Sequence, residues 1–258
     1  MRVTILGAGS IFPTQSRFAS SLLLEVDGLK FLMDCGPGTL EKLRRLGVKP
    51  TELNAVFITH FHLDHFSDTL PLIMARAYDE EGKPATSPRV LDIIGPKGIV
   101  ELIKTITEKI FPYLSNTMLC QRYLNVLELV NSIYEAYEGV KVRSVEVEHY
   151  NGVAYRVETG GKSLVYSGDT LPDERLVKLA EGCDVLIHEC SFPHSMLVGK
   201  HTSDKQLVDI VERVKPKLLV VTHLYPAWIG FEEELKKTIQ DSTGVKTIIA
   251  EDFTTLEL

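Results

Sequence analysis

A chain of 258 residues is long enough to bury a hydrophobic core as one large domain or two small ones. Hydrophobic residues make up 44% and charged residues 24% of it, which is typical of a water-soluble globular protein. No apolar run approaches the roughly 20 residues that a membrane-spanning helix needs. The net charge of −7 argues against strong nonspecific binding to nucleic acid, because that affinity comes from Lys and Arg neutralising phosphates. We therefore expect no membrane partner and a small-molecule or nucleotide-like substrate.

The N-terminus and the cysteines favour the cytoplasm. The first residues enter an apparent strand at 2–6, and their apolar run is too short for a secretory signal. The four cysteines form no C-x-x-C pair and no disulfide framework, as is usual in a reducing compartment. We expect them to be buried, unpaired side chains: Cys35, Cys120, Cys183 and Cys190.

Alternating strand and helix patterns indicate a layered α/β fold. Asp27-Gly28 predicts a hairpin between strands at 20–26 and 29–33, and Gly160-Gly161 predicts another between strands at 153–158 and 163–167. Further short apolar runs predict strands at 55–59, 90–94, 140–147, 184–187 and 218–221. Apolar residues three or four apart predict helices at 40–46, 69–78, 98–109, 119–137 and 202–211. Residues 79–89 are loop-like, but no domain boundary is evident, so one domain over 1–258 is expected.

One short stretch concentrates residue types that bind metals. His60, His62, Asp64 and His65 lie within six positions, directly after the strand predicted at 55–59. Imidazole and carboxylate are the ligands that zinc, iron or nickel prefer. His60 and His62 share a face if the backbone is extended, and Asp64 and His65 lie on the next turn if it then coils. This arrangement predicts two adjacent sets of ligands.

Other chemically active side chains follow other predicted strands. His149, Asp169, Glu189 and His223 each come at or just after such a strand. Taken singly, the two histidines could be hydrogen-bonded strand-end residues and Asp169 a turn or helix cap. Because ligands gather at the carboxyl ends of strands in layered sheets, these residues together predict a multi-ligand metal site.

This order of residues resembles the metallo-β-lactamase fold superfamily of binuclear metallohydrolases, over essentially the whole chain. Several segments resemble its ribonuclease Z branch in particular: Pro13-Thr14-x-x-Arg17-x-x-Ser20-Ser21, Asp34-Cys35-Gly36-x-Gly38-Thr39, Gly95-Pro96, His188-Glu189 and Gly199-Lys200-His201-Thr202-Ser203. The resemblance implies an αββα sandwich, in which two mixed β-sheets are flanked by helices.

The resemblance also implies a ligand assignment with two divalent metal ions. One ion would be held by His60, His62 and His149, and the other by Asp64, His65 and His223. Asp169 would bridge the two ions, and Asp34 would orient ligands through hydrogen bonds. Zn²⁺ is the first expectation, with Mn²⁺, Fe²⁺ and Ni²⁺ as alternatives because their ligand preferences overlap. A bridging hydroxide would be the nucleophile, oriented or deprotonated by Asp64.

Two further catalytic roles follow from the same resemblance. His201 would protonate the leaving group, and Glu189 would orient that imidazole and favour its protonated form. The alternative for His201 is a structural place beside a helix start, since Thr202-Ser203-Asp204 begins a predicted helix.

The sequence departs from the ribonuclease Z pattern at one point. Enzymes of that branch that process transfer RNA carry a protruding arm between the residues that correspond to His149 and Asp169, but here these two are only 20 positions apart. A single hairpin fills this interval. We therefore expect a phosphodiesterase that acts on a small or flexible phosphodiester, such as a cyclic nucleotide or a nucleic-acid end.

Alternative functions and some residues stay open. The same site could hydrolyse a lactone or thioester, or the chain could be a non-catalytic ligand-binding protein, for which a broken ligand set would be expected. The oligomeric state is not determined by the sequence, a homodimer being one option. Four side chains are either pocket walls or core residues: Tyr113, Met118, Tyr225 and Trp228.

Overall fold

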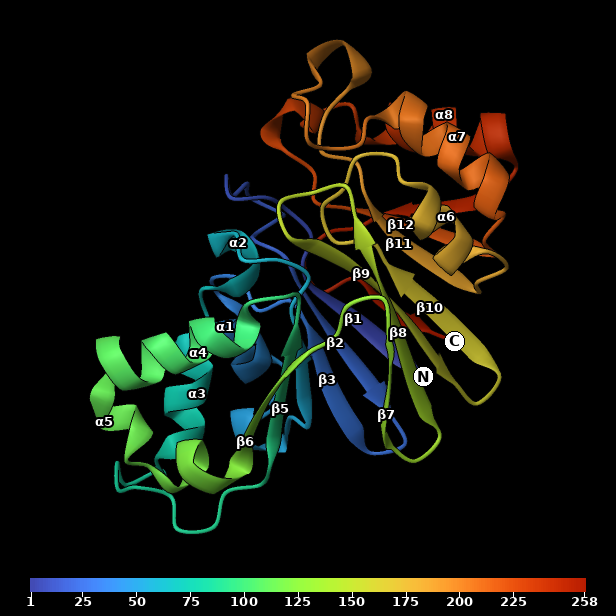
Figure 1. The fold of residues 1–258 in the computed structure, drawn as a ribbon. Coiled ribbons are helices and arrows are strands. Elements are labelled where there is room, and N and C mark those ends of the chain that lie inside the picture. The colour runs from blue at the N-terminus through green and yellow to red at the C-terminus, as the bar shows by residue number, and fades with distance from the viewer.

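The computed structural model describes residues 1–258 and contains two seven-stranded mixed β-sheets with helices on their outer faces (Figure 1). The predicted αββα sandwich is therefore confirmed. No helix has both the length and the apolar character needed to cross a membrane.

The first sheet has the strand order β14-β1-β2-β3-β4-β5-β6. Its strands are β1 (Arg2–Gly7), β2 (Ser21–Val26), β3 (Leu29–Met33), β4 (Ala55–Phe57), β5 (Leu91–Gly95), β6 (Leu124–Glu128) and β14 (Thr255–Glu257). Strands β3 to β6 pair in parallel, and the others pair antiparallel. Asp27 and Gly28 both have positive φ, at 47° and 82°, which is the conformation that a two-residue hairpin turn requires.

The second sheet has the strand order β13-β12-β11-β10-β9-β8-β7. Its strands are β7 (Ile133–Tyr137), β8 (Val140–Val147), β9 (Gly152–Thr159), β10 (Lys162–Tyr166), β11 (Val185–Glu189), β12 (Leu218–Thr222) and β13 (Lys246–Ile249). Strands β10 to β13 pair in parallel, whereas β7 to β10 form an antiparallel meander. Each sheet thus contributes a row of parallel strands whose carboxyl ends can carry functional loops.

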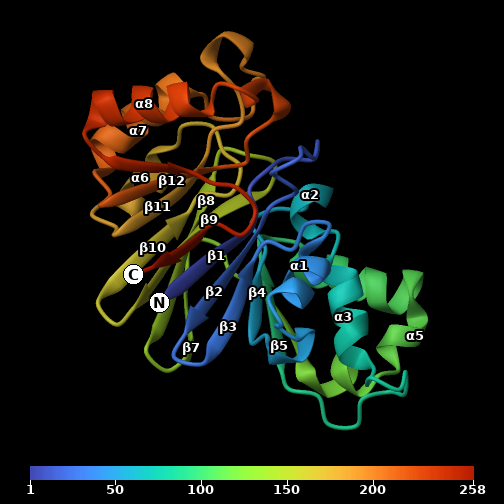
Figure 2. The same cartoon turned by 180° about the vertical axis from the view of Figure 1, so that it is seen from behind.

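The helices form the two outer layers, as the views from opposite sides show (Figures 1 and 2). The first sheet is covered by α1 (Thr39–Arg45), α2 (Leu63–Phe66), α3 (Thr69–Ala77), α4 (Ile99–Thr105) and α5 (Pro112–Ser115). The second is covered by α6 (Glu174–Ala180), α7 (Asp204–Val214) and α8 (Glu232–Thr243). Single helical turns lie at Pro50–Glu52, Ile106–Ile110, Leu119–Tyr123, His194–Met196 and Pro226–Trp228.

Three hydrophobic clusters match these layers. The largest lies between the sheets and includes the edge-to-face rings of Phe31, Phe57 and Tyr155. The other two lie between each sheet and its helices. All four cysteines are unpaired, and only Cys120 is partly exposed.

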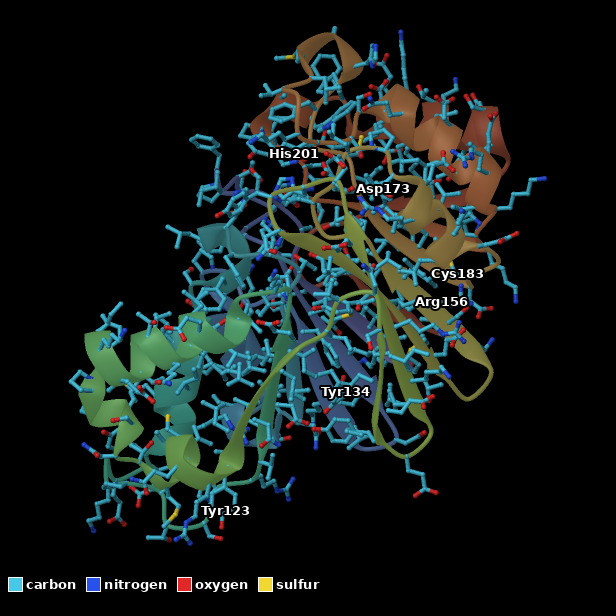
Figure 3. The ribbon with its side chains drawn as sticks, viewed as in Figure 1. Tyr123, Tyr134, Arg156, Asp173, Cys183 and His201 are labelled. Carbon is cyan, nitrogen blue, oxygen red and sulfur yellow. The ribbon has the colours of Figure 1, made fainter.

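A buried carboxylate joins the two sheets at the edge where β5, β6 and β7 meet. Asp92 of β5 accepts hydrogen bonds from the hydroxyls of Tyr134 (2.5 Å) and Tyr137 (2.7 Å) on β7. It also accepts one from the side-chain amide of Asn125 on β6, at 2.8 Å. Tyr134, labelled in Figure 3, thus links β7 of the second sheet to β5 of the first.

The helix predicted over residues 119–137 is wrong. Only Leu119–Tyr123 is helical, and the rest forms β6, a turn and β7. The apolar and aromatic residues at three- and four-residue spacing are divided between two sheets: Val126 pairs with Ile93 of β5, while Tyr134 pairs with Val142 of β8. Tertiary pairing of β-branched and aromatic residues outweighs the helical period here.

Candidate metal centre

The candidate ligands all lie at the carboxyl ends of strands, on one end of the sandwich. His60 and His62 follow β4, and Asp64 and His65 lie in the short helix α2 that comes next. From the second sheet, His149 follows β8, Asp169 follows β10 and His223 follows β12. The fold therefore brings both halves of the chain to one cluster, because the parallel strands of the two sheets end side by side.

Asp169 lies between two groups of ligand atoms. Its Oδ2 is 3.7 Å from Nε2 of His60 and 4.0 Å from Nε2 of His149. Its Oδ1 is 3.3 Å from Nε2 of His65 and 3.3 Å from Nε2 of His223. In each group, the ligand atoms lie within 4.8 Å of one another; the groups are His60, His62, His149 with Asp169, and Asp64, His65 with His223.

Several polar atoms at the centre of the cluster have no hydrogen-bond partner. Nε2 of His60, Nε2 of His65 and Oδ1 of Asp169 are all buried and unpaired. Buried polar atoms are otherwise almost always paired, since an unpaired one costs roughly 1–3 kcal/mol. Converging imidazole nitrogens and carboxylate oxygens are suitable ligands for divalent metal ions, so the residues present fit such ions.

Hydrogen bonds on the far side of the imidazoles hold these rings in place. Nδ1 of His60 lies 3.0 Å from Oγ1 of Thr59, and Nδ1 of His223 lies 2.9 Å from Oγ of Ser191. Nδ1 of His149 donates to the main-chain oxygen of Lys200 at 3.2 Å. With Nδ1 occupied by the protein, Nε2 of each ring is the nitrogen left to bind a metal.

Asp34 holds parts of the cluster in place through hydrogen bonds. It follows β3, has a φ of 60°, and is fully buried. Its carboxylate accepts hydrogen bonds from the backbone N–H of Thr59 at 2.7 Å and from the hydroxyl of Tyr166 at 2.8 Å. It also lies 2.6 Å from Nδ1 of His65. This one carboxylate therefore fixes His65 directly and the loop that carries His60.

The electrostatics of the cluster favour a positive charge at its centre. Burial holds the pKa of His60 well below its usual value, so this imidazole is neutral, as a metal ligand must be. Desolvation opposes charge on Asp169, yet His223 and His65 hold its pKa well below the usual range. For His65, desolvation is outweighed by Asp169 and Asp34, which raise its pKa well above normal. The carboxylates of Asp169 and Asp34 therefore favour positive charge where the imidazole of His65 meets them.

His201 and Glu189 form a pair beside this cluster. Nδ1 of His201 lies 3.2 Å from Oε1 of the fully buried Glu189 and 3.9 Å from Oδ2 of Asp169. Burial lowers the pKa of His201, but the hydrogen bond and charge of Glu189 outweigh burial and leave that pKa raised. His201 is labelled at the upper end of the sandwich in Figure 3, on the loop that precedes α7. A partly exposed imidazole beside the cluster can donate a proton to a bound molecule.

Comparison with known proteins agrees with this architecture. Residues 1–239 match the family model described as Anti-Pycsar protein Apyc1. The chain belongs to this family. It is also 30% identical over 253 residues to a ribonuclease Z from Mycolicibacterium paratuberculosis, which covers 91% of this chain and 89% of that protein.

Two solved structures share the fold of this Apyc1-family chain. The metallo-β-lactamase fold protein YhfI from Bacillus subtilis has a TM-score of 0.82 and 23% identity, over 99% of both chains. The short form of human tRNase Z has a TM-score of 0.76 and 24% identity, over 100% of this chain and 99% of that one. The resemblance to the metallo-β-lactamase fold superfamily and its ribonuclease Z-like branch is therefore confirmed, and the relatives support a metal-dependent hydrolase.

The candidate pocket walls lie in three different places. Tyr225 lies beside the cluster, with its ring centroid 5.7 Å from that of His223. Trp228 is buried and donates through Nε1 to the main-chain oxygen of Cys190 at 2.8 Å, so it is a core residue. Tyr113 and Met118 lie in or beside α5, away from the metal cluster, and Tyr113 contacts Phe111.

Several supporting residues carry no metal-ligand chemistry of their own, and the sequence did not predict their roles. Thr59 and Ser191 each link a ligand imidazole to a buried carboxylate, since Ser191 also donates to Oε2 of Glu189 at 2.5 Å. Tyr166 supports Asp34, and Lys200 contributes only a main-chain oxygen. The one available signal was position: Thr59 precedes the histidine cluster, and Ser191 is two residues after Glu189.

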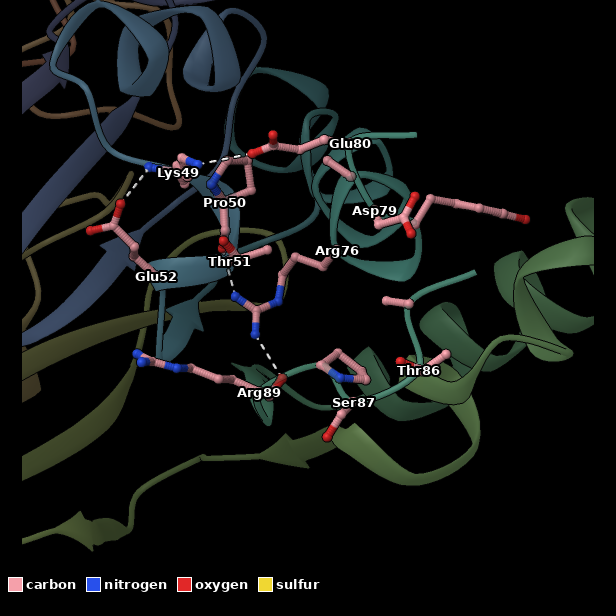
Figure 4. A pocket seen from close by; sticks show the side chains of 14 residues that line it. Lys49, Pro50, Thr51, Glu52, Arg76, Asp79, Glu80, Thr86, Ser87 and Arg89 are labelled. Atoms are coloured by element: carbon pink, nitrogen blue, oxygen red, sulfur yellow. Dashed lines mark hydrogen bonds and ion pairs between the residues drawn. The ribbon is translucent and has the colours of Figure 1, made fainter. Parts of the chain in front are cut away.

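One sizeable cavity lies away from this cluster. A cavity of about 750 Å³ lies among residues 49–52, 75–80 and 85–89, where Arg76 is bound by main-chain oxygens (Figure 4). Arg76 donates to the carbonyls of Pro50, Leu53 and Arg89. Residues 50–52 precede β4, whereas the candidate ligands His60 and His62 follow it, so this cavity belongs to the opposite end of the sheet. It contains none of the candidate metal ligands.

Proposed function

We propose that this chain is a dinuclear metal-dependent phosphodiesterase that hydrolyses a small or flexible phosphodiester, such as a cyclic nucleotide. Residues 1–258 would form a single catalytic domain, with ligands from both sheets. The observation that carries the proposal is the pair of His201 and Glu189 beside a cluster of seven metal-ligand residues. Phosphodiester cleavage with an alkoxide leaving group needs a proton donor next to the metal-bound phosphate.

The two groups of candidate ligand atoms support the following assignment. His60, His62 and His149 would hold one divalent ion, and Asp64, His65 and His223 the other, with one oxygen of Asp169 directed at each. Zn²⁺ is the first candidate, with Mn²⁺, Fe²⁺ and Ni²⁺ as alternatives. When bound, two such cations supply a water-derived nucleophile at neutral pH and neutralise charge on the phosphate.

The protein's own residues would orient the reactants and move the protons. Asp64, whose Oδ2 lies 3.4 Å from Nε2 of His223, would orient the attacking water and accept its proton. His201, held through Nδ1 by Glu189, would present Nε2 to the departing oxygen and donate a proton to it. Glu189 itself is fixed by the backbone N–H of Thr170 at 2.7 Å, so it acts as a positioning residue.

The short connection between His149 and Asp169 supports a small substrate. The hairpin β9–β10 fills this interval, and no arm extends from it. With a net charge of −7, the chain offers little attraction to a long polyanion. A ribonuclease Z relative is named for action on RNA, and a nucleotide-like phosphodiester is the small counterpart of that chemistry.

The discriminating experiment compares leaving groups in wild-type enzyme and His201→Ala. We expect turnover of phosphodiesters by the metal-loaded wild type, and a loss in His201→Ala of at least about 100-fold for alkyl esters but much less for nitrophenyl esters, which hardly need protonation. Equal losses on both ester types would remove His201 from the role of acid. Hydrolysis of lactones or thioesters without any phosphodiester turnover would assign the site to carbonyl substrates instead.

A further inference from the structure

A group of aromatic side chains extends outward from the metal cluster. The ring of Tyr225 has its centroid 5.7 Å from that of His223 and 5.8 Å from that of His201. It also contacts the ring of Phe192, with 4.3 Å between centroids and 30° between ring planes. The centroid of the Phe12 ring lies 6.1 Å from that of Tyr225. Tyr225 and Phe192 are half-buried, whereas Phe12 is 60% exposed. The three rings come from three separate segments and form one surface next to the candidate proton donor.

The exposed ring of Phe12 is held beside the cluster by the backbone. Gly9 forms a parallel bridge with Leu224, and the N–H of Leu224 donates to the carbonyl of Ala8 at 3.2 Å. The segment before Phe12 therefore lies against the residue that separates His223 from Tyr225. Phe12 also donates its own N–H to Oγ of Ser10 at 3.3 Å.

The return of this loop is anchored by the buried Arg17 and the half-buried Asp252. Arg17 donates through Nε to the main-chain oxygen of Ala250 at 2.8 Å and forms an ion pair with Glu232 at 3.0 Å. Oδ1 of Asp252 accepts hydrogen bonds from the N–H groups of Ala8 and Phe18 at 3.1 and 3.0 Å. Both ends of the loop are thus fixed to the C-terminal part of the chain, and Phe12 is presented by a structured loop, not by a loose terminus.

We propose that Phe12, Tyr225 and Phe192 form the stacking surface for the nucleobase of the substrate. This inference rests on the proposed phosphodiesterase function and deepens it, because it names the part of the substrate that lies next to His201. Aromatic faces stack on any base, since every base has a π-face, so the surface selects nucleotides over phosphodiesters without a base and discriminates weakly among bases. A flat heterocycle is the occupant that fits three adjoining rings beside a phosphate-binding site.

The test measures steady-state kinetics of metal-loaded Phe12→Ala on adenosine 3′,5′-cyclic phosphate and on the corresponding cyclic ribose phosphate that lacks the base. We expect KM for the nucleotide to rise about tenfold with little change in kcat, and both parameters for the base-free ester to stay unchanged. Phe12→Trp, which keeps an aromatic ring at this position, should have the wild-type KM. The matched control is Phe231→Ala, which removes an equally exposed ring (54%) that contacts none of the three rings.

Binding provides a readout that does not need turnover. Calorimetry should show adenosine 5′-monophosphate binding more tightly than ribose 5-phosphate to the wild type, with the difference lost in Phe12→Ala. Equal effects of Phe12→Ala on substrates with and without a base, or no effect on either, would overturn the stacking surface. A selective nucleotide defect in Tyr150→Ala but not in Phe12→Ala would do the same, because Tyr150 stacks on His62 at the other ligand group. If the wild type cleaves neither ester, the proposed function fails, while calorimetry still tests the base contact.

Discussion

Asp34 and His65 lie 2.6 Å apart, Oδ2 to Nδ1, and neither side chain is exposed to solvent. This contact directs Nε2 of His65 toward Asp169, at 3.3 Å, and Asp64, at 3.8 Å. Asp34 therefore sets the orientation of one candidate ligand, His65, without itself belonging to the candidate metal cluster.

Replacing Asp34 with Asn should weaken metal binding while leaving the fold in place. Asn tolerates the positive φ of this position but removes the negative charge that favours the correct His65 orientation. We expect a loss of about 10- to 100-fold in affinity for the metal, measured by competition with a chromophoric chelator. Asp92→Asn, a buried carboxylate on β5 far from the ligands in the fold, is the control and should keep wild-type affinity. Unchanged affinity in Asp34→Asn would show that His65 needs no such support.

Gly36→Ala should disturb both stability and the metal site. A Cβ at this position would lie 2.0 Å from the main-chain oxygen of Asp64, so α2 would have to shift. Overpacking of this kind costs about 1–3 kcal/mol, and here it displaces a ligand as well. The free energy of unfolding in urea and the metal content should both fall. Gly199→Ala, where an added Cβ meets nothing within 4 Å, should match the wild type in both measurements, and equal behaviour of the two variants would refute the close contact.

Tyr134→Phe should lower stability without lowering activity. The hydroxyl donates to Asp92 at 2.5 Å across the edge where the two sheets meet, far from the metal ligands. Removing a hydrogen bond to a buried carboxylate costs about 1.5–3 kcal/mol. The free energy of unfolding in urea should fall by that amount while kcat/KM stays constant. The control is Tyr123→Phe, which removes a hydroxyl for which the structure has no hydrogen bond and should change neither the free energy of unfolding nor kcat/KM. A loss of kcat/KM in Tyr134→Phe would contradict the prediction, because it would show that this edge of the sheets affects catalysis.

The sequence was informative wherever one local signal was sufficient. Asp27-Gly28 and Gly160-Gly161 predicted two hairpins, because few residues other than Gly, Asp and Asn adopt the positive φ that such turns need. The crowding of His60, His62 and His65 predicted the cluster, and apolar runs that end at Asp169 and His223 supplied candidate partners from the other sheet. These signals depend on backbone geometry and ligand chemistry, both of which are local.

Other features depended on contacts that no local pattern contains. Residues 119–137 have helical spacing, yet Val126 and Tyr134 belong to different sheets, because pairing with β5 and β8 decides their conformation. Ser191 has its role only because Glu189 and His223 end neighbouring parallel strands. The aromatic surface of Phe12, Phe192 and Tyr225 joins segments that are up to 213 positions apart. Such partners are found only in the folded chain.

Metal analysis of Asp169→Ala beside the wild type tests the central claim most directly. Both oxygens of Asp169 face ligand groups, so losing this side chain should disturb both ions together. We expect about two divalent ions per wild-type chain under metal-replete conditions, and less than about one in Asp169→Ala. Asp184→Ala, which removes the half-buried ion-pair partner of the exposed Lys217, should keep the wild-type content. Full occupancy in Asp169→Ala, or less than about one ion in the wild type, would contradict a dinuclear site bridged by this residue.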